Sequence, residues 1–156
     1  MNVLGLGLFA SGQYEEALSV QEAQLSMLRR LGASEGYVLA VQGNLANTYG
    51  ELGRDKKTLL MRQELYSGRL KLDGEEHNST IIAANNYANT LAGMQRFEEA
   101  KLLMRKMVPV ARRVLGESHD ITLTMRCVYA RALYKDDGAT LEAVSYTHLR
   151  AHETLL

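Results

Sequence analysis

The sequence contains few or no residues of several types, and each low count excludes certain structures or classes of protein. It has one cysteine, Cys127, so no disulfide can form within it, which favours a reducing compartment and a cytoplasmic location. Tryptophan is absent, and aromatic residues make up only 6% of the chain. No apolar run reaches the roughly 20 residues that a membrane-spanning helix needs, so we expect no membrane partner.

An excess of charge of either sign is also missing. The chain has 18 Lys and Arg residues against 18 Asp and Glu residues. A balanced chain has no overall field that would attract nucleic acid or an anionic membrane. We therefore expect no nucleic-acid partner.

Proline is nearly absent as well. The single one, Pro109, lies inside a segment that otherwise has a helical pattern, from Phe97 to Leu115. Proline removes a helix hydrogen bond and its ring clashes with the preceding turn, so we expect a kink near residues 105–109.

What the sequence does contain is an internal repeat. The segment 44–49 (NLANTY) returns 42 residues later as 86–91 (NYANTL), and 74–77 (GEEH) returns at the same shift as 116–119 (GESH). A fixed period of 20 to 50 residues indicates a solenoid built from stacked repeats. We expect the array to occupy residues 1–143, about three and a half units.

Each unit has the pattern of two helices. In the first, small and apolar residues recur at the spacing of one buried helix face, as at Leu39, Leu45 and Tyr49. The second helix is expected to begin near Asp55 or Phe97. Asn78 and Asp120 stand where the next helix begins, and we expect them to cap it. Because no run of alternating β-branched residues competes, we expect an all-α fold.

These motifs resemble the tetratricopeptide repeat (TPR), whose first helix carries N-L-[GA]-N-x-Y and whose turn carries G-x-[YF]-x-[ED]-A. Here the motifs are residues 44–49 and Phe97–Ala100. The 42-residue unit, with L-G-x-x-H at Leu115–His119, is similar to the kinesin light chain type. That family usually has proline after the histidine, and this chain does not. The resemblance implies a TPR-type α-solenoid of antiparallel helix pairs that form a right-handed superhelix.

The last residues break the period. Val144–Thr154 reads VSYTHLRAHET, which is the translation of a transposon adapter used in sequencing libraries. We interpret residues 144–156 as an adapter-derived, non-native tail. His148 and His152 have the i, i+4 spacing of helical zinc ligands. We set them aside on this ground and expect neither a metal nor a cofactor.

Four asparagines are the main candidate site. Asn44 and Asn47 share a helix face, and Asn86 and Asn89 repeat that face one unit later. Asparagine is unfavourable inside a helix, so its presence there needs a reason. The amides could form hydrogen bonds between helices that set the stacking register. They could also line a groove and bind a peptide backbone, since an amide both donates and accepts. The two interpretations are compatible.

The resemblance implies that these asparagines lie on the concave surface, with Asn85 at its border. On the last repeat, Arg131 and Lys135 continue the same face and would suit acidic groups of a partner. The alternative is that both are ordinary solvated charges.

The implied function is non-catalytic binding of a protein or extended peptide, as in a kinesin light chain-like cargo adaptor. One alternative is a regulatory segment of a larger NTPase or signalling enzyme, which a P-loop elsewhere in the gene would favour. Another is an array that serves self-association.

Overall fold

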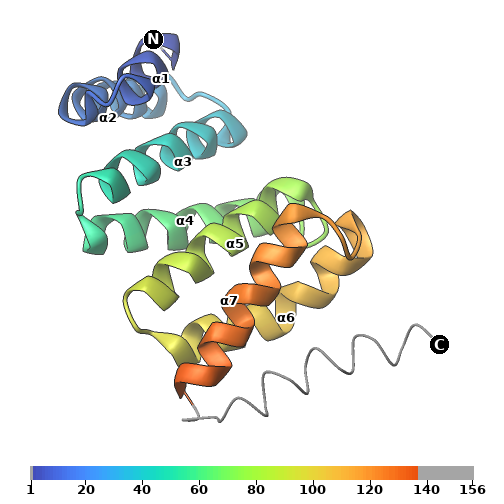
Figure 1. Ribbon diagram of the computed structural model, residues 1–156. Coiled ribbons are helices and arrows are strands. Elements are labelled where there is room, and N and C mark those ends of the chain that lie inside the picture. The colour runs from blue at the N-terminus through green and yellow to red at the C-terminus, as the bar shows by residue number, and fades with distance from the viewer. Residues whose placement is uncertain (1, 137–156) are drawn as a thin grey trace. The chain divides into compact units, whose positions relative to one another are not determined.

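The computed structural model describes residues 2–136, and all regular structure in that range is helical, which confirms the all-α prediction. The expected tail at residues 144–156, with His148 and His152, lies outside the described residues. The helices, shown in Figure 1, are α1 (Asn2–Ala10), α2 (Tyr14–Arg30), α3 (Glu35–Glu51), α4 (Asp55–Asp73), α5 (Asn78–Gly93), α6 (Phe97–Leu115) and α7 (Asp120–Asp136).

The helix boundaries follow the period of the sequence. Helices α4 and α6 begin at Asp55 and Phe97, as predicted, 42 residues apart. Helices α5 and α7 begin at Asn78 and Asp120, again 42 residues apart. Because equivalent residues of each unit begin equivalent helices, the repeat in the sequence is a repeat in the structure.

The chain divides into two compact units, residues 1–83 and residues 84 onward, with the boundary inside α5. In the first unit α1 packs on α2, α2 on α3 and α3 on α4, and α1 also touches α3. The centre of its core is a cluster of Leu18 and Leu25 from α2 with Val41, Leu45 and Tyr49 from α3. Leu39, Leu45 and Tyr49, three of the predicted buried positions, are each 5% exposed or less.

In the described part of the second unit, α6 packs on α7. Methionine, valine and alanine side chains fill this core, which agrees with the low aromatic content. Fully buried residues include Met104, Met107 and Ala111 from α6 with Met125 and Ala132 from α7. Methionine suits such a core because its flexible thioether chain fills irregular gaps.

Pro109 does not end α6, which runs unbroken from Phe97 to Leu115. Pro109 is exposed, and so is Arg105, whose carbonyl loses its helix partner to the proline. Both residues therefore lie on the exposed side of α6, apart from the buried Met104 and Ala111. The expected kink, which concerns the curvature of α6, stays a prediction.

The turn after α3 closes with the hydrogen bonds of a Schellman motif. The Gly53 N–H donates to the Gly50 carbonyl at 3.0 Å, and the Arg54 N–H donates to the Tyr49 carbonyl at 2.9 Å. Gly53 has a φ of 65°, the left-handed conformation that this motif needs. Gln95 occupies the same place after α5, with a φ of 61°.

The prediction that Asn78 and Asp120 cap the following helices is wrong. Both are the first residues of their helices. The capping acceptors belong to the preceding histidines: His77 Nδ1 accepts the N–H of Ser79, and His119 Nδ1 accepts the N–H of Ile121, each at 3.2 Å. A side chain in that place satisfies a helix-terminal N–H that would otherwise lack a partner.

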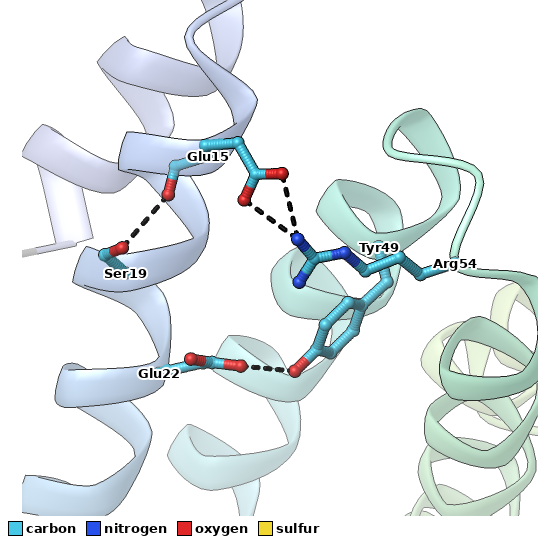
Figure 2. A network of polar contacts seen from close by, with 5 residues as sticks. All are labelled: Glu15, Ser19, Glu22, Tyr49 and Arg54. Atoms are coloured by element: carbon cyan, nitrogen blue, oxygen red, sulfur yellow. Dashed lines mark hydrogen bonds and ion pairs between the residues drawn. The ribbon is translucent and has the colours of Figure 1, made fainter.

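A polar network joins α2 to α3 and to the start of α4 (Figure 2). The Tyr49 hydroxyl donates to Glu22 Oε1 at 2.5 Å, and Arg54 Nη2 lies 2.9 and 3.0 Å from the two carboxylate oxygens of Glu15. Burial, and then the hydrogen bond to Glu22, raise the pKa of Tyr49 to about 12. The phenol therefore stays neutral at ordinary pH and acts as a donor across the α2–α3 interface.

Candidate peptide-binding surface

One side of α3 faces away from the core of the first unit. Its residues recur at helical spacing, and we call them the α3 face: Tyr37, Ala40, Asn44, Asn47 and Glu51. Asn44 is half-buried and the other four are exposed. The opposite side of the same helix carries the buried Leu45 and Tyr49. Four of the five residues of the α3 face are therefore exposed, on the side of the helix opposite the buried Leu45 and Tyr49.

Asn47 is held in one orientation by a residue of α4. Its Oδ1 accepts a hydrogen bond from Arg62 Nη2 at 3.3 Å. A guanidinium can only donate, so the oxygen end of the amide must face Arg62. Arg62 itself is half-buried, and burial lowers the pKa of its guanidinium.

The hydrogen bond that joins α2 to α3 at this level is made by a different residue. The Thr48 hydroxyl lies 2.7 Å from Gln21 Oε1, and both side chains are buried. The same hydroxyl lies 3.2 Å from the carbonyl of Asn44, one turn earlier in α3. A buried polar contact next to Asn44 and Asn47 thus helps to set the register of α2 against α3.

In the second unit the equivalent asparagines are both half-buried on α5. Asn89 Nδ2 donates to the main-chain carbonyl of Asn85 at 3.2 Å and lies 3.5 Å from its Oδ1. Asn85 itself is only 7% exposed. It lies beneath the surface and supports Asn89, whereas the sequence placed it at the border of the groove.

Arg131 and Lys135 lie four residues apart on α7, and both are exposed. Val128, one turn before Arg131, is buried. Lys135 Nζ lies 5.8 Å from the centre of the Tyr134 ring, a cation–π distance. The two cations are therefore neighbours on one side of α7, in its last two turns.

Arg62 is the residue of this surface that the sequence analysis missed. The sequence does contain a sign of its importance: position 62 is charged, whereas the corresponding position of the next repeat is Met104. Met104 is fully buried, so a cation at the equivalent place breaks the apolar pattern of the second helix. The hydrogen bond between this cation and Asn47 is visible only in the fold.

Within residues 2–136 no group of three or more His, Cys, Asp or Glu side chains is placed to hold a metal ion. Over the same range, every helix is too short or too polar to cross a lipid bilayer.

The comparisons with known proteins concern one repeat in sequence and most of the chain in structure. Residues 80–120 match the profile of the tetratricopeptide repeat family. The crystal structure of the nearly identical TPR-like repeats of a kinesin light chain-like protein from Podosopora anserina superposes with a TM-score of 0.75 at 22% identity. The match covers 85% of this chain and 64% of that one. The fold is that of a TPR array.

Two further solved structures agree with this assignment. A single-substitution variant of the same TPR-like repeats has a TM-score of 0.77 at 22% identity, covering 85% of this chain and 63% of that one. BtubC (BKLC) from P. vanneervenii has a TM-score of 0.66 at 17% identity, covering 90% of this chain and 62% of that one. This TPR array thus spans less than two thirds of each solved chain. No curated protein matches it.

Proposed function

We propose that this TPR array is a cytoplasmic, non-catalytic scaffold segment that binds the main chain of a protein or extended peptide through its asparagine faces. The observation that supports this most directly is the position of Asn47. It is exposed in the middle of a helix, and a second residue holds its amide in place. An isolated helix gains nothing from such an asparagine.

The chemistry of an amide fits the main chain of a partner. Each peptide unit offers one N–H donor and one carbonyl acceptor, and an asparagine side chain can satisfy either. The first unit carries the amides of Asn44 and Asn47, and the second carries those of Asn86 and Asn89. Main-chain recognition leaves the side chains of the partner to other contacts, which suits a scaffold.

Arg131 and Lys135 would add a preference for acidic groups. Both side chains are exposed on α7, and both are long enough to form an ion pair with a carboxylate of a bound segment. The likeness of the fold to kinesin light chain-like repeats leads us to propose cargo attachment as the role of this scaffold.

The test is a peptide-array screen of the full chain against the double variant Asn44→Ala/Asn86→Ala, which removes one amide from each unit. We expect the variant to lose tenfold or more in affinity for the peptides that the wild type selects, with an unchanged helical circular dichroism spectrum. Gln63→Ala, which removes an exposed amide from α4, is the matched control and should bind as the wild type does. Equal binding by the double variant would rule out main-chain recognition by these amides.

A further inference from the structure

Asn47 and Asn89 are equivalent residues of two repeats, 42 positions apart, yet the structure holds their amides by opposite ends. Asn47 is held by its oxygen, which accepts from Arg62 Nη2 at 3.3 Å. Asn89 is held by its nitrogen, which donates to the carbonyl of Asn85 at 3.2 Å. The chemistry of each neighbour decides the orientation, because a guanidinium only donates and a carbonyl only accepts.

In each amide, the end that makes no hydrogen bond within the described part of the protein is the end that a partner can contact. At Asn47 this end is the NH₂ group, on an exposed side chain. The guanidinium behind it polarises the amide, which makes its N–H groups stronger donors. At Asn89 the end opposite the Asn85 carbonyl is Oδ1, so this amide is left with an acceptor.

We propose that Arg62 is a positioning residue that turns Asn47 into a hydrogen-bond donor toward the partner, while Asn89 is an acceptor. The partner atom at Asn47 is then a main-chain carbonyl oxygen, and the partner group at Asn89 is a main-chain N–H. This inference rests on the proposed function for its binding role, whereas the orientation of the two amides can be measured without a partner.

The first experiment needs no ligand. In ¹⁵N-labelled protein, the side-chain NH₂ cross-peaks of Asn47 are assigned by their absence in Asn47→Asp. We expect them to move toward the positions of free amides in Arg62→Met, while the Asn89 cross-peaks stay unchanged. Methionine occupies the equivalent place in α6, as the buried Met104, so the substitution suits the fold. Asn47 cross-peaks that do not move in Arg62→Met would overturn the role of Arg62.

The second experiment measures binding of a peptide selected by the array screen. We expect Arg62→Met and Asn47→Ala each to weaken binding about fivefold to tenfold, and the double variant to be no worse than either. Arg62→Lys, which keeps a donor, should recover part of the loss. Losses that multiply in the double variant would show that Arg62 acts independently of Asn47 and would overturn the proposal.

The third experiment tests the acceptor. Ester analogues of the same peptide, in which one main-chain N–H is replaced by oxygen, lose a donor at one position at a time. We expect one ester position to weaken binding to the wild type and to have no further effect in Asn89→Ala. Ester effects that are identical in wild type and Asn89→Ala would overturn the assignment of Asn89. If Asn44→Ala/Asn86→Ala binds normally, the proposed function fails, and the cross-peaks of Asn47 still decide the role of Arg62.

Discussion

At the scale of single residues, Gln95 sits in a backbone conformation that favours glycine. Its φ is 61°, and the equivalent turn after α3 uses Gly53 at 65°. The two turns have the same hydrogen bonds: the Gln95 N–H donates to the Ala92 carbonyl at 3.2 Å, and the Arg96 N–H donates to the Leu91 carbonyl at 2.8 Å. A side chain in this conformation brings Cβ close to the following carbonyl, at a cost of about 1 kcal/mol.

Replacing Gln95 by glycine should therefore stabilise the protein. We expect Gln95→Gly to raise the free energy of unfolding by roughly 0.5–1 kcal/mol, read from the midpoint of urea denaturation. The reciprocal change, Gly53→Gln, should lower it by a similar amount. A Gln95→Gly protein no more stable than the wild type would show that the turn tolerates the side chain without strain.

The two capping histidines lead to a second prediction at this scale. His119 Nδ1 accepts the N–H of Ile121 in the first turn of α7, at 3.2 Å. We expect His119→Ala to lower the free energy of unfolding by about 1 kcal/mol, because that N–H loses its side-chain acceptor. His119→Asn supplies another acceptor and should recover most of the lost stability. Thermal melts of the wild type and both variants measure the difference. An alanine variant as stable as the asparagine variant would argue against capping.

At the scale of helices, the α2–α3 interface carries a titratable hydrogen bond. Tyr49 is 5% exposed, and its hydroxyl donates to Glu22 on the neighbouring helix. Its pKa is raised from 10.0 to about 12, so the folded state favours the neutral phenol more than the unfolded state does. The stabilisation is thus fully present below pH 10 and is lost as the pH rises through 12.

We expect this group to cost about 2 kcal/mol of stability between pH 10 and pH 12. The comparison is between wild type and Tyr49→Phe, with urea denaturation at half-unit steps over that range. The phenylalanine variant should lose less stability over the range, because it lacks the ionising group. Tyr87, whose pKa burial also raises, is present in both proteins and does not affect their difference. Parallel pH profiles would exclude Tyr49 as the source.

At the scale of the whole molecule, a net charge of zero hides an uneven distribution. Residues 2–83 contain eight Lys and Arg against ten Asp and Glu, whereas residues 84–136 contain nine against five. The sequence-wide balance correctly describes the total but conceals a basic stretch over residues 84–136, the described part of the second unit. An acidic partner would meet an attractive field on this unit only.

This distribution predicts salt-dependent binding of an acidic probe. We expect a labelled ten-residue oligoglutamate to bind more weakly as salt rises from about 50 to about 500 mM, measured by fluorescence anisotropy. Arg131→Gln/Lys135→Gln should weaken binding at low salt about threefold to tenfold, the range of two exposed ion pairs. The control, Lys56→Gln/Lys71→Gln, removes two exposed lysines of the first unit. If the control loses as much affinity, the cations of α7 have no special role.

Much of this architecture could be predicted from the sequence because its causes are local. The 42-residue period, the starts of α4 and α6 and the buried face of α3 all follow from which residues recur at helical spacing. The capping histidines could also have been predicted, since His77 and His119 recur at equivalent positions of the repeat. They were missed because the usual capping residues stood beside them.

The tertiary structure alone decided which asparagines of the candidate site are exposed and which end of each amide faces a partner. Arg62 and Asn47 are 15 residues apart and meet only because α4 folds back along α3. Asn85 has the same side chain as the other candidates, yet its position on α5 leaves it only 7% exposed. A repeat determines which residues share a face, because helical spacing is a local property. Which end of an amide faces outward depends on a neighbour from another helix or from the preceding turn.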